Sequence, residues 1–343
     1  MKKKIFSAVF LVAVFALTIW SVFKGEDLSQ VIAHLSEADL LYIIPAVMCV
    51  LGFIIGESVI IYYLMRTFGV RMRFRSCCRY SFIGFFYSCI TPSAGGGQPM
   101  QVVEMRGDGI PVAVSAITLA IITIMYKSVL VLLGSVVLLL RPDSVMCFLE
   151  PVMFWVILGL CLNVLWVSVL LMLVFRPQVV RKLAGWILRL GTWLRLIRNP
   201  EKLENRVERI LTQYEGTSEY FRTHTHVIFH VFLMTMLQRT LLFFVTWLTY
   251  KSFHLEGGSI PLITTLQGMI AVSVDMIPLP GGMGISENLF LEVFSPMFGE
   301  KLVLSGMVVS RGISFYSQLL ISAAVTAGIV LTRQIKRKKG GKA

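Results

Sequence analysis

Hydrophobic residues form long runs along the chain, and short polar or charged stretches separate these runs. A helix needs about 20 consecutive apolar residues to cross the core of a bilayer. The runs that approach or exceed this length are residues 5–23, 40–65, 111–140, 151–175, 227–250 and 302–331. They predict an all-α integral membrane protein, a single membrane domain over residues 1–343, with about six full transmembrane helices. The composition agrees, since 56% of the residues are hydrophobic.

The first run, residues 5–23, follows a Lys-rich start and so resembles a signal peptide. A removable signal also carries a cleavage site of small residues. No such site occurs before Lys24. We therefore expect residues 5–23 to be retained as the first transmembrane helix.

Two further apolar stretches are interrupted. The sequence AGGGQP interrupts the first at residues 94–99, and IPLPGGMG interrupts the second at residues 277–284. Proline removes a backbone donor and glycine favours non-helical conformations, so each interruption ends a helix. The pattern predicts two re-entrant broken hairpins, residues 80–108 and residues 260–298. The prolines at the breaks are Pro92, Pro99, Pro278 and Pro280.

The order of span, broken hairpin and span occurs twice, in residues 40–140 and again in residues 227–331. The matching motifs are Pro92-x-x-Gly95-Gly96 and Pro278-x-x-Gly281-Gly282. Transporters built from inverted repeats place their substrate site where the broken helices meet, near the middle of the bilayer. We therefore predict an inverted-repeat arrangement with a site between the two hairpins.

The charges give the expected orientation. Lys and Arg number 32 against 19 Asp and Glu. The basic residues gather before the first run, at residues 66–79, at residues 176–222 and after residue 331. In residues 24–39, by contrast, most of the charged residues are acidic. Loops rich in Lys and Arg stay in the cytoplasm, so we expect both termini there. The basic excess is then a topology signal, and no nucleic-acid partner is expected.

Residues 178–222 form a separate region. Apolar residues recur there at helical spacing while Arg and Lys supply the charge, which predicts cytoplasmic basic amphipathic helices. Such helices lie on an anionic cytoplasmic leaflet. A solvated connector between the two halves is the alternative interpretation.

The glycines of the breaks could bind an anion. A helix that starts after a break has free backbone donors and the positive end of its dipole, which suit phosphate or carboxylate. The glycines in such positions are Gly95, Gly96, Gly281, Gly282 and Gly284. The alternative is that they only allow helices to pack closely.

Ionisable residues also fall within the apolar runs and hairpins. They are Glu57, Lys127, Arg239, Asp275, Glu287 and Arg311, with Glu104 near the first hairpin. Each charge at the bilayer centre costs about 2.5–3.5 kcal/mol, so these residues must pair, neutralise or face a wet cavity. Lys127, Arg239 and Arg311 could hold an anionic head group. The carboxylates could be their resting ion-pair partners or take up protons that couple transport. A purely structural network of salt bridges is the alternative.

Other kinds of chemistry lack their motifs. His224, His226 and His230 lie close together in sequence, but no H-E-x-x-H motif or nearby cysteine accompanies them, so no metal site is expected. The chain has no P-loop motif for ATP and no G-x-S-x-G nucleophile motif. We expect no cofactor.

Three short sequences resemble those of a known family: TPSAGGGQPMQVVEM at 91–105, PLPGGMGISENLF at 278–290 and SRGISFY at 310–316. The family is the lysylphosphatidylglycerol synthase transmembrane family, the flippase-like membrane domain of the multiple peptide resistance factor. The resemblance covers nearly the whole chain. It implicates Pro92, Gly95, Gly96, Glu104, Pro278, Pro280, Gly281, Gly282, Gly284, Glu287 and Arg311. The chain departs from the family pattern at Tyr126-Lys127, where an acidic residue and an arginine would be expected.

The resemblance implies a translocase in the bacterial inner membrane that moves an anionic or aminoacylated phospholipid, such as lysyl-phosphatidylglycerol, between leaflets. In bifunctional members a separate cytoplasmic domain attaches lysine to phosphatidylglycerol. Because this chain ends at Ala343 after a short basic tail, we do not expect it to catalyse that step alone. The alternatives are a phosphatidylglycerol lysyltransferase or a subunit of aminoacyl-phospholipid synthesis, and a membrane scaffold or regulator. Beyond the phospholipid, a second copy of the chain or a partner synthase are possible partners.

Overall fold

The computed structural model describes residues 38–91, 95–176, 178–179, 181–182, 185–186, 212, 219, 224–279, 282 and 284–340. The predicted first transmembrane helix, residues 5–23, lies outside the described residues, as does most of the predicted amphipathic region. The described part of the chain is all helical and contains no strand. Its helices are α3 (Leu40–Thr67), α4 (Phe74–Cys89), α5 (Gly97–Gly107), α6 (Val112–Leu140), α7 (Asp143–Leu149), η2 (Glu150–Val152), α8 (Met153–Phe175), α11 (Thr225–Ser252), α12 (Ile260–Val274), α13 (Ile285–Phe298), α14 (Val303–Arg311), η4 (Gly312–Ser317) and α15 (Gln318–Gly340).

Five stretches of helix in the described residues are long and apolar enough to cross a membrane. They are Leu40–Thr67, Val112–Leu140, Asp143–Val174, Thr225–Ser252 and Val303–Arg333. Each contains one of the predicted runs, or nearly all of it. The last stretch joins α14, η4 and α15 into one long helix, in which η4 is a π-helical turn. Such turns inside α-helices are frequent at functional sites.

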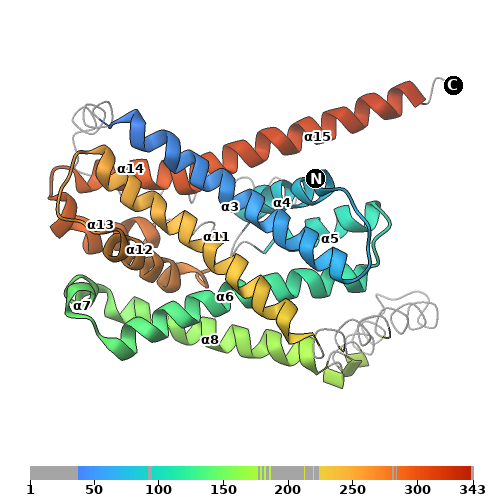
Figure 1. Ribbon diagram of the computed structural model, residues 1–343, viewed down its shortest axis with the longest axis horizontal. Helices are drawn as coiled ribbons and strands as arrows, with labels where there is room; N and C mark the ends of the chain where they lie inside the picture. The colour runs from blue at the N-terminus through green and yellow to red at the C-terminus, as the bar shows by residue number, and fades with distance from the viewer. Residues whose placement is uncertain are drawn as a thin grey trace.

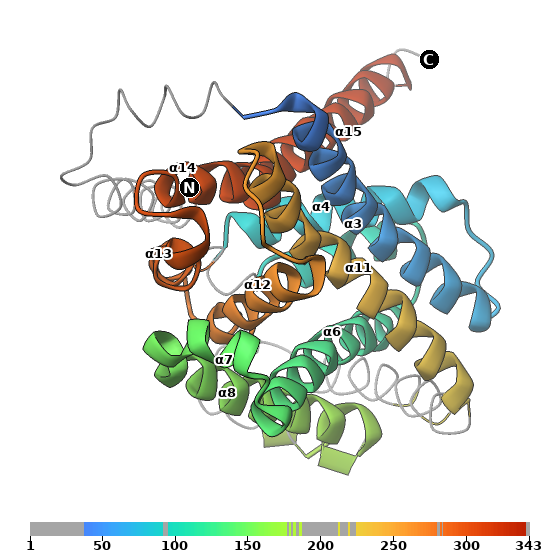
Figure 2. The same ribbon diagram turned by 60° about the vertical axis from the view of Figure 1, so that its left-hand side comes forward.

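Helices α3 and α11 lie side by side along the middle of the molecule in both views (Figure 1, Figure 2). Helix α4 packs against α3, α5 and α15, and α12 packs against α11, α13 and α6. Helix α8 covers α6 and α12 on the outside of the bundle, and the end of α15 extends beyond it (Figure 1). Three neighbours of α4, namely α3, α5 and α15, match α11, α13 and α6 beside α12 in their order along the two halves, but α12 also packs against α7 and α8, which have no counterpart beside α4 in the described residues.

Local sequence explains where several helices begin and end. Asp39 caps α3 by accepting a hydrogen bond from the Leu41 N–H at 2.8 Å. Gly69, with φ at +72°, follows the end of the same helix. Ser259 caps α12 by accepting from the Leu262 N–H at 3.4 Å, and a proline occupies the first turn, where no donor is needed.

Small residues let some helices approach closely. A Cβ on Gly97 of α5 would lie 2.6 Å from the carbonyl oxygen of Gly84 on α4. A Cβ on Gly159 of α8 would lie 2.6 Å from Ser273 Cα, at the end of α12. Membrane helices pack through such small residues because lipid gives apolar side chains no driving force to associate.

Candidate functional site

Each half of the bundle contains a break between two short helices. The first break joins α4 to α5 at residues 90–96, and the second joins α12 to α13 at residues 275–284. In the first, the Gly96 N–H donates to Thr91 Oγ1 at 2.9 Å. In the second, Gly282 and Gly284 have φ of +67° and +87°, conformations that disfavour side chains with a Cβ. Pro92, Pro280 and Gly281 lie outside the described residues.

Glu287 lies in the first turn of α13, directly after the second break. Its Oε2 accepts a hydrogen bond from the Gly284 N–H at 2.7 Å, and its Oε1 accepts one from Arg311 Nε at 2.9 Å. The Glu287 side chain is only 4% exposed and that of Arg311 12%. The guanidinium of Arg311 also lies over the Phe315 ring in η4. A carboxylate at this position satisfies a free helix donor and holds a buried cation.

A second ion pair lies where the second break begins. Lys127 of α6 donates to the Asp275 carboxylate, and both side chains are largely buried. Asp275 follows the last residue of α12. The pair therefore ties the middle of α6 to the start of the second break.

Arg239 of α11 lies between two aromatic rings. Its guanidinium is 3.4 Å from the centroid of the Tyr126 ring and 4.9 Å from that of Phe53. Its Nε is buried and has no hydrogen-bond partner within the described residues. Stacking on aromatic faces is favourable for a guanidinium, and it leaves the Nε–H, which lies in the plane of the guanidinium, available to another acceptor.

Glu57 of α3 connects this arginine to the first break. Its Oε1 accepts a hydrogen bond from Gln101 Nε2 at 2.6 Å, and Gln101 belongs to α5. Glu57 also interacts electrostatically with Arg239. At the start of α5, Gln98 donates to Thr123 of α6.

These residues form a polar chain, defined here as Gln101, Glu57, Arg239, Tyr126, Lys127 and Asp275, in which Glu57 and Arg239 interact electrostatically and form no direct ion pair within the described residues. It runs from the helix after the first break, through α3, α11 and α6, to the start of the second break. With Glu287 and Arg311, it brings three cations and three carboxylates into the interior of the bundle. Such an arrangement can hold an anion if a carboxylate gives up its cation.

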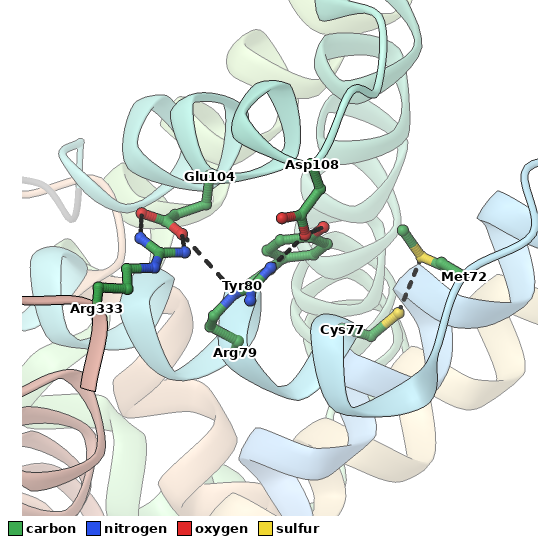
Figure 3. A network of polar contacts seen from close by, with 7 residues as sticks. All are labelled: Met72, Cys77, Arg79, Tyr80, Glu104, Asp108 and Arg333. Atoms are coloured by element: carbon green, nitrogen blue, oxygen red, sulfur yellow. Dashed lines mark hydrogen bonds and ion pairs between the residues drawn. The ribbon is translucent and has the colours of Figure 1, made fainter. Parts of the chain in front are cut away.

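Glu104 lies in a different place from the polar chain. Arg333 of α15 donates to its two oxygens at 2.9 and 2.6 Å, and Arg79 Nε approaches it at 3.8 Å. Figure 3 shows Glu104 between these two arginines, with Asp108 beside Arg79 and over Tyr80. Arg79 and Tyr80 both donate to Asp108. Burial, and then the neighbouring Asp108, raise the pKa of Tyr80, so the phenol keeps the proton that it donates.

The remaining predicted residues differ in exposure. Gly282 is buried and Gly96 half-buried, whereas Gly95, Pro99 and Pro278 are exposed. The three predicted histidines lie at and after the start of α11, where His230 hydrogen-bonds to Tyr63 through Nδ1 at 2.9 Å. Within the described residues, no group of three or more His, Cys, Asp and Glu side chains could hold a metal ion.

Sequence reasoning missed several residues of these networks. Phe53, Gln101 and Tyr126 belong to the polar chain or contact it, and Arg79, Asp108 and Arg333 surround Glu104. Gln101 carried the clearest signal, because it is an amide within a hairpin expected to lie in the membrane. The rings of Phe53 and Tyr126 cannot be told from ordinary packing residues by sequence.

Comparison with known families gives a match over most of the chain. The matching family model is described as the lysylphosphatidylglycerol synthase TM region, and it covers residues 7–322. This range includes both breaks and the whole polar chain. No curated protein matches the chain.

Proposed function

The chain belongs to the lysylphosphatidylglycerol synthase transmembrane family, and we propose that it is a phospholipid translocase of the bacterial inner membrane. Membership of this family implies a function that concerns membrane lipids. The finer proposal is that the protein moves an anionic or aminoacylated phospholipid, such as lysyl-phosphatidylglycerol, from one leaflet to the other.

The observation that carries the proposal is the polar chain between the two breaks. Charged groups in a membrane helix are costly and usually mark a substrate path. Here the charged groups extend from Glu57 on α3 to Asp275, and Arg239 between them has a buried Nε without a hydrogen-bond partner in the described residues. That donor is available to an anionic ligand.

The geometry suggests how a head group could pass. A lipid phosphate would accept from the Arg239 guanidinium, which the rings of Phe53 and Tyr126 hold in a fixed plane. Lys127 and Arg311 could then contribute by exchanging their carboxylates for the phosphate. The acyl tails would stay in the lipid outside the bundle, where α8 exposes apolar residues such as Leu165.

The test is the transbilayer movement of phosphatidylglycerol with a fluorescent head group, in vesicles containing the full chain. The wild type should speed this movement over protein-free vesicles. Arg239→Gln should reduce the rate by about tenfold or more, since it removes a charge-assisted contact to phosphate. Arg239→Lys should recover only part of the rate, because it keeps the charge and loses the planar fork.

Arg141→Gln is the matched control, since Arg141 is exposed at the end of α6. It should move lipid at the wild-type rate. Equal rates for wild type and Arg239→Gln would contradict the proposal. If cells expressing only this chain accumulated lysyl-phosphatidylglycerol while the purified protein moved no lipid, synthesis would replace translocation as the function.

A further inference from the structure

A cavity of about 500 Å³ lies apart from the polar chain, beside the network around Glu104. Its walls come from the connection between α3 and α4, from the first two turns of α4, and from the turn between α5 and α6. Arg79, Tyr80 and Asp108 line the cavity and also belong to that network, whose side chains are drawn in Figure 3. The cavity is thus a separate feature, and the proposed translocation path does not use it.

The cavity carries an excess of positive charge. Arg71, Arg73 and Arg79 line it, against the single carboxylate of Asp108, which already accepts from Arg79 and Tyr80. Arg71 and Arg73 are exposed and form no ion pair within the described residues. Like charges gathered around one hollow repel one another, and a bound anion would relieve that repulsion.

The backbone at the start of α4 and a nearby hydroxyl group also favour binding of an anion in the cavity. Arg73 precedes α4 and provides no side-chain cap, so the positive end of the helix dipole lies at the cavity wall. The Ser76 side chain, in the first turn of α4, also lines the cavity. Guanidinium groups, a hydroxyl and a helix start are a combination that suits phosphate oxygens.

The position of the cavity favours a lipid as the source of that phosphate. The membrane-crossing candidate α3 ends at Thr67, and the cavity begins at Val70, a few residues beyond the hydrophobic span. That is the level at which lipid phosphates lie. Apolar side chains, among them Met72 and Ile110, also line the cavity and could contact the glycerol of a lipid.

We propose that this cavity binds the phosphate of an anionic phospholipid from the adjacent leaflet, held by Arg71 and Arg73 with Arg79 at the inner wall. The inference rests on the proposed function only for the placement of the chain in a membrane. It requires no transport. A lipid bound here would lie beside Arg79, which contacts both Asp108 and Glu104.

The test uses phosphatidylglycerol that carries a photoreactive head group, in vesicles containing the full chain. After illumination, peptide mass spectrometry measures the label on residues 70–80 and 108–111. Arg71→Gln combined with Arg73→Gln should lower this label by about tenfold, because two cations near the surface are lost. Arg71→Lys combined with Arg73→Lys should keep most of it, because both positive charges remain, and equal thermal stability of the two double variants in detergent should show that the Gln variant folds.

The matched control is Arg66→Gln combined with Arg75→Gln. It removes the same charge from neighbouring exposed arginines that do not line the cavity, and it should leave the label within about twofold of the wild type. Equal loss in both double variants would overturn the proposal, since it would show attraction to the surface in general.

Competition identifies the ligand. Unlabelled phosphatidylglycerol should displace the label, whereas diacylglycerol, which lacks the phosphate, should not. Displacement by inorganic phosphate at the concentration where the lipid competes would overturn the lipid assignment in favour of free phosphate. The photolabel measures lipid binding at the cavity, whereas the transport assay measures lipid movement across the bilayer. The two proposals can therefore fail independently of each other.

Discussion

The two breaks have similar sequences, but their glycines serve different physical purposes. At the first break, Gly97 lies so close to Gly84 and Ser88 of α4 that a side chain would not fit. At the second, Gly282 and Gly284 adopt positive φ angles that turn the chain into α13. The matched glycines differ as well, because Gly96 has a φ of −85° and Gly282 a φ of +67°, so a Pro-Gly-Gly motif does not prescribe one geometry. It allows either close packing or a turn.

Their carboxylates differ in the same way. Glu287 lies in the first turn of α13 and binds Arg311 of the next helix, within its own half. Glu104 lies near the end of α5 and binds Arg333 of α15, in the other half. Lys127 lies 35 residues after Pro92, much as Arg311 lies 33 residues after Pro278, and it also pairs across the halves, with Asp275. Glu287 thus stabilises the second break from within its own half, whereas Glu104 and Asp275 each pair with a cation of the other half.

The largest effect is expected where the second break is stabilised. Glu287→Gln removes the negative charge that holds Arg311 in a buried site, and breaking such a pair costs about 3–5 kcal/mol. We expect a large fall in thermal stability in detergent and loss of lipid movement. Glu292→Gln, on the exposed face of the same helix, is the control and should behave as wild type. Wild-type stability in Glu287→Gln would show that this pair does not hold the break.

Breaking the ion pair between the two halves should have the second largest effect on stability. Lys127→Met leaves Asp275 without its cation and should destabilise the fold by about 3 kcal/mol. Adding Asp275→Asn removes the isolated charge, so the double variant should regain much of that stability. A double-mutant cycle from denaturant unfolding measures this coupling. Lys301→Met, at an exposed position, serves as the control, and additive losses at Lys127 and Asp275 would contradict the pairing.

The two roles of glycine predict that the two breaks tolerate different substitutions. Gly97→Ala should cost about 1–3 kcal/mol through overpacking against α4. Gly282→Asn should cost less than Gly282→Val, because asparagine accepts positive φ more readily than a β-branched residue. Thermal unfolding of the three variants checks the order. Gly107→Ala is a control at a helix end where a Cβ meets no atom within 4 Å. Equal costs for Asn and Val at residue 282 would contradict the turn role.

The smallest effect is expected at Glu104. The Arg333 side chain is 46% exposed, so solvent screens the pair even though it is bidentate. Glu104→Gln should therefore cost only about 1 kcal/mol. Arg333→Gln in that background should add little further loss of thermal stability. A loss as large as that of Glu287→Gln would mean that the two breaks depend equally on their carboxylates.

Much of the fold could be predicted, because uninterrupted apolar length is a strong signal. The run predicted at residues 40–65 is α3 (Leu40–Thr67), and the run at 111–140 is α6 (Val112–Leu140). The first hairpin is predicted at residues 80–108, and α4, the helix before the first break, spans Phe74–Cys89.

The site could be predicted as a set of residues but not as a set of contacts. Apolar surroundings made Glu57, Lys127 and Asp275 conspicuous. Their partners depend on how distant helices pack, so the pairing of Lys127 with Asp275 cannot be read from spacing. Glu104 and Glu287 each follow a Pro-Gly-Gly motif in the sequence, but their contacts differ. Whether these residues bind lipid stays a prediction.

The most direct test of a head group between the breaks is a photoreactive residue introduced in place of Gln98, on α5, and separately in place of Leu165, on the exposed face of α8. Each protein is illuminated in vesicles containing phosphatidylglycerol labelled with radioactive phosphate. One sample is then treated with a phospholipase that leaves the phosphate on the diacylglycerol. A second sample is treated with a phospholipase that removes the phosphate together with the head group. A phosphate that lies at the breaks predicts that position 98 captures the head-group fragment, and that position 165 captures only the acyl fragment. The same fragment at both positions, or no capture at position 98, would contradict a head-group site between the breaks.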